Sequence, residues 1–347
     1  MKLPWNPTYP KLEEIHKVLL VRQDRIGDVI LTLPLITELK KLAPHLQTEV
    51  LVTPYTQPLA ECFVGVDRAW AIPLEKDWKS FSKEIYNQNY DLVIVPNSKS
   101  RIATLVYEAN IPFRMGPGLR WHGWRYNLPL YQSRKRPVCN ELTYNLQLLS
   151  PWRSLPENEN ISFPFTLPVA SINRVKQFIQ EQSLNSFIII HPGSGGSAID
   201  LPIDILKAVI RQLPGDKKIV ITGGPSEKTL GDSLQALDTN RIYNTAGMWN
   251  LTELMAFISL SSFFIGNSSG PLHIARAFNV PLLGFYSTYP ACHPIRWGPY
   301  QQEKRNTLLP PHESFDTFCL DKKISQQNFQ SIKPESIIQK LIELGFN

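Results

Sequence analysis

The sequence predicts an α/β protein with two domains, each built around a parallel sheet. Three observations support this fold class. Short apolar runs alternate with helical patterns in both halves of the chain, as they do in parallel sheets. The 347 residues exceed what one hydrophobic core usually organises. Loops rich in Gly, Ser or charge follow the apolar runs, where such sheets bind their ligands.

The first half of the chain contains three predicted strands and one basic segment. The strands are expected at residues 18–21, 49–53 and 91–96. The first strand turns through residues 24–28 into a helix that reaches about Lys41. Residues 114–140 mix Arg and Lys with Trp and Tyr, and we interpret them as a loop-rich insert. Such an insert either grips an acceptor or forms a solvated surface.

The second half repeats the alternation after a proline-containing linker at residues 151–168. Strands are expected at residues 187–190, 218–222, 263–265 and 281–285. Helices are expected at residues 173–182, 251–260, 272–278 and 334–344. No close internal sequence repeat is visible, so the two halves share a pattern without sharing residues.

Composition excludes several classes of protein. The net charge of +6 is a mild bias that fits an anionic ligand, an anionic membrane surface or no charged partner at all. The four cysteines are widely spaced, which argues against a zinc site and favours reduced thiols in a cytoplasm. No signal peptide, membrane-spanning run, metal-ligand pattern or nucleic-acid-binding module is recognised.

Asp28 follows a glycine at the first strand-to-helix turn. A carboxylate at this position can accept the proton of a substrate hydroxyl. It can equally cap the helix, which is a common use of Asp at a helix start. Local sequence leaves both interpretations open.

A second turn, Gly266–Gly270, leads into a helix with Pro271 in its first turn. Free backbone N–H groups and the positive end of the helix dipole make such a turn suitable for phosphate. His273 lies one turn into the helix and can donate a charge-assisted hydrogen bond to the same group. The alternatives are a simple helix cap and a buried core histidine.

Two further residues are candidates for contacts with a nucleoside. Glu227, after Gly-Gly-Pro-Ser, can accept hydrogen bonds from ribose hydroxyls, although the helix dipole also favours an ordinary Glu there. Trp249 can stack on a nucleobase or pack in a core.

Taken together, these motifs resemble those of glycosyltransferase family 9, the heptosyltransferases of lipopolysaccharide core assembly. The two specific matches are VLLVRQDRIGDVILTLPLITELKK at 18–41 and IGNSSGPLHIARAFNVPLLGFY at 265–286. Four shorter segments follow the family's order: HPGSGG at 191–196, ITGGPSE at 221–227, NTAGMWNLTEL at 244–254 and IRWGPY at 295–300. The resemblance covers nearly the whole chain.

The resemblance implies the GT-B fold, in which two Rossmann-like domains with parallel sheets face each other across a cleft. Residues 1–165 would form the acceptor-binding domain, and residues 166–330 would bind the nucleotide sugar. Residues 331–347 would form a C-terminal helix that packs back on the N-terminal domain.

The resemblance also implies an inverting glycosyltransferase that needs no metal and no cofactor. It would transfer a sugar, typically heptose from ADP-heptose, to a lipopolysaccharide core or another surface glycan. Asp28 would be the general base that removes the proton of the acceptor hydroxyl. The diphosphate and nucleotide would be bound by Ser194, Glu227, Trp249, Ser269, Gly270, Leu272 and His273.

Within that set, the backbone N–H groups of Ser269, Gly270 and Leu272 would stabilise the leaving diphosphate. Ser194 would add a hydroxyl, Glu227 would hold the ribose and Trp249 would lie at the adenine. Asn267 and Ser268 would contact the donor sugar. The acceptor would be a lipid-linked or phosphorylated saccharide that meets Arg101, Arg120 and Arg125. The protein would be cytoplasmic, with peripheral contact with the inner membrane.

Two departures from the family pattern bear on the donor. Ile199 stands where many members carry a Lys that neutralises the diphosphate, so Arg22, Arg25 or Arg296 would have to replace that charge. Ser268 stands where many members carry an Asp that contacts the donor sugar. These departures leave room for another donor sugar or reduced activity. The rival functions are a nucleotide-sugar epimerase or hydrolase, and a non-catalytic protein that binds sugar nucleotides.

Overall fold

The computed structural model describes residues 7–73, 78–154 and 161–346, which form two compact units. The first unit contains residues 7–133 and 142–166, and the second contains residues 134–141 and 167 onward. The sequence predicts a domain boundary after residue 165, and the units divide after residue 166. The exception is the segment 134–141, which belongs to the second unit.

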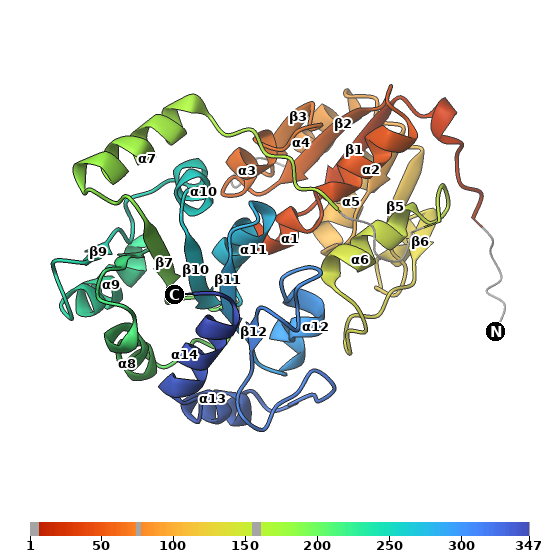
Figure 1. The fold of residues 1–347 in the computed structure, drawn as a ribbon. Coiled ribbons are helices and arrows are strands. Elements are labelled where there is room, and N and C mark those ends of the chain that lie inside the picture. Colours follow the sequence, from red (N-terminus) through yellow and green to blue (C-terminus); the bar gives the residue numbers. More distant parts are fainter. Residues whose placement is uncertain (1–6, 74–77, 155–160, 347) are drawn as a thin grey trace. The chain divides into compact units, whose positions relative to one another are not determined.

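The described part of the first unit contains a six-stranded parallel sheet in the order β3-β2-β1-β4-β5-β6 (Figure 1). Its strands are β1 (Lys17–Val21), β2 (Gln47–Val52), β3 (Arg68–Ala71), β4 (Leu92–Ile94), β5 (Phe113–Pro117) and β6 (Leu128–Leu130). In the register, Leu19 of β1 lies beside Glu49 on one side and Val93 on the other. The central strands are almost fully apolar because both faces of a parallel sheet are covered.

The α-helices of this part of the chain are α1 (Ile26–Ile30), α2 (Pro34–Leu42), α3 (Gln57–Glu61), α4 (Trp78–Tyr86), α5 (Ser100–Glu108) and α6 (Glu141–Leu146). Short 3₁₀ turns lie at Leu12–Glu14, Gly123–Arg125 and Gln147–Leu149. In α2, Pro34 occupies the first turn, where its missing N–H is tolerated, and Leu35, Ile36 and Leu39 are buried. One helix predicted from residue 28 to 41 is therefore two helices, α1 and α2.

The basic segment at 114–140 is more regular than the sequence predicts. β5 and β6 pair in parallel, with Met115 beside Leu128 and Pro117 beside Leu130. The ring of Tyr126 packs on Gly116, where an added Cβ would lie 2.4 Å from the ring. The prediction of a loop-rich insert is wrong for these two strands, because strands of three to five residues are too short to show a clear pattern.

The described part of the second unit also contains a six-stranded parallel sheet, in the order β12-β11-β10-β7-β8-β9. Its strands are β7 (Phe187–His191), β8 (Lys218–Ile221), β9 (Ile242–Asn244), β10 (Phe263–Asn267), β11 (Leu282–Phe285) and β12 (Thr307–Leu308). Counted from β9, this order repeats that of the first sheet counted from β3. Both orders are the doubly wound arrangement of dinucleotide-binding folds, in which ligands bind at the carboxyl ends of the strands.

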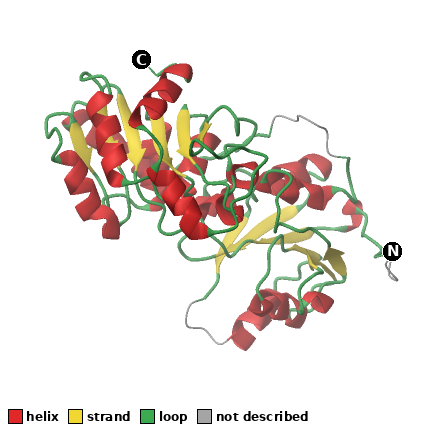
Figure 2. Ribbon diagram, turned by 90° about the horizontal axis from the view of Figure 1, so that it is seen from below, coloured by secondary structure: helices red, strands yellow, loops and turns green. Residues whose placement is uncertain are grey.

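The α-helices of the second unit are α7 (Val169–Glu181), α8 (Ile203–Gln212), α9 (Lys228–Gln235), α10 (Leu251–Ser259), α11 (Gly270–Ala277), α12 (Pro294–Trp297), α13 (Lys322–Gln330) and α14 (Pro334–Glu343). Short 3₁₀ turns lie at Pro225–Glu227 and Pro290–Cys292. Helices and strands alternate along this unit (Figure 2). A capping box fixes the start of α10, since Asn250 and Glu253 each accept the other's backbone N–H at 2.9 Å.

The C-terminal helix packs within the second unit. Ile337 and Leu341 of α14 join the core formed by Ile188, Leu206 and Ile210, and α14 lies against α8. Packing of residues 331–347 on the first domain stays a prediction.

The described residues contain neither a candidate membrane-spanning helix nor a disulfide bond. In residues 7–73, 78–154 and 161–346 we find no helix with the length and apolarity that a membrane-spanning segment requires. The four cysteines, all of them described, form no disulfide.

Candidate functional site

In the first unit, Asp28 lies in the first turn of α1, just beyond the carboxyl end of β1. Its carboxylate forms an ion pair with Arg22, whose side chain is 1% exposed, whereas Asp28 is 18% exposed. Arg25 is the N-cap residue and makes no side-chain capping bond, so the carboxylate of Asp28 is not a helix cap. Of the two interpretations of Asp28, the structure therefore disfavours capping and leaves a carboxylate with access to solvent.

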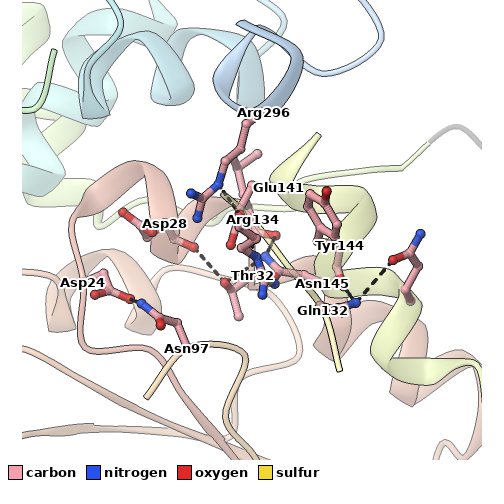
Figure 3. A network of polar contacts seen from close by, with 12 residues as sticks. Asp24, Asp28, Thr32, Asn97, Gln132, Arg134, Glu141, Tyr144, Asn145 and Arg296 are labelled. Carbon is pink, nitrogen blue, oxygen red and sulfur yellow. Dashed lines mark hydrogen bonds and ion pairs between the residues drawn. The ribbon is translucent and has the colours of Figure 1, made fainter. Parts of the chain in front are cut away.

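Arg22 also pairs with Asp24, with Nε 2.9 Å from Oδ2. Burial raises the pKa of Asp24, and the Arg22 guanidinium opposes that rise. Asn97, after β4, donates from Nδ2 to Asp24 Oδ2 at 3.3 Å (Figure 3). One buried guanidinium thus holds two carboxylates. From the sequence, Arg22 is predicted only as a substitute cation for the diphosphate, and no local pattern indicates its pairing with the two carboxylates.

The end of α1 is fixed by a second set of hydrogen bonds (Figure 3). Thr32 Oγ1 donates to the carbonyl oxygen of Asp28 at 2.7 Å. Asn145 of α6 donates from Nδ2 to Leu31 O at 2.8 Å and to Thr32 Oγ1 at 3.1 Å. The backbone of Asp28 is therefore anchored on the side away from its carboxylate.

The three arginines predicted for the acceptor follow the neighbouring strands β4 and β5. Arg101, in the first turn of α5, lies over Trp78 at 4.0 Å from the ring centroid. Arg125 lies over Trp124 at 4.3 Å and near Trp121 at 6.0 Å, and Arg120 is exposed. Among the contacts of the described residues, none joins Arg101 to the other two. They share an edge of the sheet with Asp28 but form no single cluster.

In the second unit, the turn after β10 leads into α11 as predicted. Ser269 is the N-cap residue of α11 in extended conformation, and its hydroxyl is buried with no hydrogen-bond partner among the described residues. Neither Ser269 nor Gly270 donates its backbone N–H to any described residue. Unpaired donors at a helix start are what a phosphate needs.

Leu272 is the exception in this turn. Its N–H donates to Ser269 O at 3.2 Å, so this donor is already engaged within the turn, and its role at the diphosphate stays a prediction. His273 is 5% exposed and meets the ring of Trp297 edge-on, with centroids 6.3 Å apart. The turn therefore offers the N–H groups of Ser269 and Gly270, one hydroxyl and one histidine.

Asn267 and Ser268, predicted to contact the donor sugar, are both buried. Asn267 donates from Nδ2 to Pro192 O at 2.5 Å and to Asp200 Oδ1 at 3.2 Å, and its Oδ1 accepts from Leu201 N at 3.0 Å. Both N–H bonds of the amide are engaged, so only the oxygen has capacity left for a sugar. Asn267 thus fastens the loop after β7 to the end of β10.

The loop after β7 closes on itself through Ser194. Ser194 Oγ accepts from Ala198 N at 3.2 Å, and Ser194 O accepts from Ser197 Oγ at 2.7 Å. Gly195 and Gly196 adopt positive φ angles of 55° and 73°, which glycine tolerates best. The predicted hydroxyl of Ser194 is therefore present but already accepts one bond inside its own loop.

Glu227 ends the 3₁₀ turn after β8 and folds back over two neighbouring loops. Its Oε2 accepts from Gly224 N at 2.7 Å. A Cβ at Gly193 would lie 1.5 Å from Glu227 Oε1, and a Cβ at Gly223 would lie 3.0 Å from its Oε2. Because β7 and β8 are adjacent, the carboxylate spans the ends of both strands. The glycines provide the space for it.

Trp249 packs on Phe178 and Phe257, with centroids 5.2 and 5.0 Å apart, and Arg174 lies 5.6 Å over its ring. This contact set fits the core-packing interpretation. The indole Nε1 is buried with no partner among the described residues, which leaves one donor. The role at adenine stays a prediction.

Ile199, at the position where the family often carries a Lys, is 5% exposed and belongs to the core of the second unit. The cation expected there is replaced by an apolar contact. Sequence reasoning also missed a carboxylate, Glu141, which meets Arg296 although 155 residues separate them. No local signal could have revealed a pair that distant.

Comparison with known proteins decides the family. A profile of glycosyltransferase family 9 (heptosyltransferase) matches residues 78–325, which is more than half of the chain. The chain belongs to glycosyltransferase family 9. As a member of that family, the protein is a glycosyltransferase, and the resemblance drawn from its motifs is confirmed.

The alignments of this family 9 chain with its relatives and with solved structures cover most of its length. It is 30% identical over 314 residues to a Haemophilus influenzae protein whose name suggests a glycosyltransferase, covering 86% of this chain and 90% of that one. It is 26% identical over 302 residues to lipopolysaccharide heptosyltransferase 3 of Escherichia coli, covering 79% and 83% respectively.

Among solved structures, the family 9 chain is similar to the ADP-heptose lipopolysaccharide heptosyltransferase II of E. coli. The TM-score is 0.77 at 18% identity, and the match covers 94% of this chain and 98% of that one. This likeness concerns the fold alone. Together with the two parallel sheets, it confirms the predicted GT-B fold class.

Proposed function

We propose that this protein is an inverting glycosyltransferase that moves a sugar from a nucleotide-diphosphate sugar to a lipopolysaccharide core or another surface glycan. ADP-heptose is the expected donor, because the named relatives include lipopolysaccharide heptosyltransferases. Family membership favours transfer over the rival epimerase and hydrolase functions. The observation that carries the mechanism is the accessible, anchored carboxylate of Asp28.

In the proposed reaction, an acceptor hydroxyl attacks the anomeric carbon of the donor. A new carbon–oxygen bond forms as the bond from that carbon to the diphosphate oxygen breaks, with inversion. Asp28 takes the proton of the hydroxyl, which becomes acidic only as the bond forms. Arg22 fixes the orientation of the Asp28 carboxylate.

The diphosphate departs with the electron pair of the broken bond. The N–H groups of Ser269 and Gly270, the Ser269 hydroxyl and His273 are the proposed groups that stabilise its charge. Glu227 is the proposed ribose ligand, and Trp249 remains the proposed neighbour of the adenine. We also propose, as the family resemblance implies, that the reaction proceeds without a metal ion.

On the acceptor side, we propose that Arg101, Arg120 and Arg125 bind anionic groups of the glycan. Arg101 and Arg125 lie over tryptophan rings, which orients their guanidinium groups and leaves hydrogen-bonding edges for a ligand. The acceptor of such an enzyme is lipid-linked, so peripheral contact with the inner membrane from the cytoplasmic side is part of the proposal.

The decisive experiment measures transfer from ADP-heptose to lipopolysaccharide core by wild-type protein, Asp28→Asn and Asp24→Asn. Loss of a general base lowers kcat by roughly 10²- to 10⁴-fold, and Asp28→Asn should fall in that range while ADP still binds. Asp24→Asn is the matched control, because it removes the other carboxylate on Arg22 and should lose much less.

The same assay tests the metal and the rival functions. EDTA should leave the wild-type rate unchanged. Turnover of the donor without any acceptor would instead indicate an epimerase or hydrolase. If Asp28→Asn transferred sugar at the wild-type rate, Asp28 would not be the base.

A further inference from the structure

Glu141 lies where two arginines of the second unit meet (Figure 3). Its side chain is fully buried, and its Oε2 accepts from Arg296 Nε at 2.7 Å and from Arg134 Nε at 3.1 Å. The arginines are 17% and 15% exposed. A carboxylate this deeply buried needs such partners, because removing its charge from water is unfavourable unless it is paired.

One carboxylate meets two guanidinium groups in this cluster, and an arginine stays protonated at every physiological pH. The hydrogen bond of Arg296 to Glu141 uses Nε alone. The guanidinium of Arg296 also lies over the ring of Trp297, 4.4 Å from the centroid. Held at Nε and at its flat face, Arg296 keeps the Nη edge for planar, bidentate recognition of an anion.

Trp297 connects Arg296 to the turn that starts α11. Its ring lies edge-on to His273, 6.3 Å between centroids, and its carbonyl oxygen accepts from Tyr286 Oη at 3.0 Å. Ser269 is the N-cap residue of the same helix, and its buried hydroxyl has no partner among the described residues. Trp297 thus contacts both the guanidinium of Arg296 and the ring of His273. His273 lies on α11, the helix whose first N–H groups have no partner among the described residues.

We propose that Arg296 binds a phosphate group of the substrate and that Glu141 is the residue that positions it. The inference rests on the proposed function and names a residue that supplies positive charge to its diphosphate. It also accounts for the apolar residue at position 199, since the cation comes from α12. The phosphate can belong to the donor diphosphate or to a phosphorylated acceptor, because both present the same chemistry.

Calorimetry with ADP and adenosine tests the donor as the source. Arg296→Gln should weaken ADP binding roughly ten- to a hundredfold, as expected for the loss of a hydrogen bond to a charged group, and should leave adenosine binding nearly unchanged. Arg296→Lys keeps the charge but loses the planar fork, so its ADP affinity should be intermediate. Glu141→Gln should lower the ratio of ADP to adenosine affinity without abolishing adenosine binding.

Arg241→Gln is the matched control. Arg241 is 12% exposed and pairs with Asp238 at 3.2 Å, but it lies just before β9, at the amino ends of the strands. It should change thermal stability without changing the ratio of the two affinities. A purely structural role for Arg296 and Glu141 would give the same result as this control.

Transfer to phosphorylated and dephosphorylated lipopolysaccharide core tests the acceptor as the source. If Arg296→Gln raised KM only for the phosphorylated core and left ADP affinity unchanged, the phosphate would be that of the acceptor. If neither ADP selectivity nor that KM changed, the inference would be overturned. ADP binding by the unaltered protein tests the proposed function separately, so the two failures are distinguishable.

Discussion

At the scale of single residues, the structural environment decides whether a side chain at a predicted site position can take part in binding or catalysis. Asp28 and Ile199 both stand at positions that the family pattern marks as functional. Asp28 keeps an accessible carboxylate because Arg22, and not the helix, is its partner. Ile199 lies in the core, where a lysine would have to bury its charge. The first position therefore keeps an accessible carboxylate, as the proposed chemistry requires, and the second holds an apolar side chain that packs in the core.

His191 gives the clearest prediction at this scale. It ends β7 with its Nδ1 2.9 Å from Thr222 Oγ1, and burial lowers its pKa from 6.5 to about 4. The folded state thus prefers the neutral ring. The contribution of His191 to the free energy of unfolding is fully present above pH 6.5. It decreases below that pH, because the unfolded chain takes up a proton that the folded chain does not, and it is lost by about pH 4. The total change is about 3 kcal/mol.

Urea unfolding between pH 8 and pH 4 checks this expectation. The free energy of unfolding of His191→Gln should depend less steeply on pH than that of the wild type, and the difference should develop between pH 6.5 and 4. His312→Gln, which alters an exposed histidine, should keep the wild-type slope. Equal slopes for wild type and His191→Gln would contradict the burial argument.

At the scale of the element, the connections after β7, β8 and β10 do more than join strands. Asn267 fastens the loop after β7 to the end of β10, and Glu227 folds from the turn after β8 onto Gly193. The loop after β7 is thus held by one side chain from each of the two neighbouring connections. A substitution in one of these connections should therefore displace side chains in the neighbouring connection.

Gly193→Ala tests this coupling. Its Cβ would lie 1.5 Å from Glu227 Oε1, so the carboxylate must move away. ADP affinity should fall roughly tenfold or more, as expected when a hydrogen bond to a charged group is lost. Calorimetry measures it.

The double variant Gly193→Ala/Glu227→Gln should bind ADP no worse than the weaker single variant, because both changes remove one interaction. Gly215→Ala is the control, since a Cβ there meets nothing within 4 Å. Additive losses in the double variant would show that Gly193 acts without Glu227.

At the scale of the whole molecule, two units repeat one strand order without a close repeat of sequence. Each carries its candidate residues at the carboxyl ends of its strands. The first unit adds an exposed aromatic loop, in which Trp121 and Trp124 are 76% and 63% exposed. The loop is tight, because a Cβ at Gly123 would lie 2.7 Å from Gly118 O. Tryptophan beside arginine is typical of surfaces that meet a membrane interface.

Sedimentation with vesicles tests the proposed membrane contact. The protein should bind vesicles that contain phosphatidylglycerol more strongly than neutral ones, and added salt should weaken this binding. The double variant Trp121→Ala/Trp124→Ala should bind at least roughly fivefold less, since two apolar anchors are lost. Tyr86→Ala, at another exposed aromatic residue, is the control. Unchanged binding of the double variant would exclude this loop.

The sequence by itself determined the fold class, the family and the turns that carry Asp28 and Ser269. These features depend on contacts between near neighbours: apolar runs of strand length, a proline in the first turn of a helix, and small polar residues at strand ends. Their order along the chain was enough to identify the family. The short strands β5 and β6 escaped detection because so few residues carry no clear pattern.

Only the tertiary structure decided which side chains are partners. Arg22 was visible in the sequence, but its ion pair with Asp28 was not. The N–H of Leu272 donates to a carbonyl of its own turn, and the apolar side chains of α14 pack in the core of the second unit. The pairing of Glu141 with Arg296 spans 155 residues. Such pairs arise when the sheet brings distant loops to one edge, and no local pattern records them.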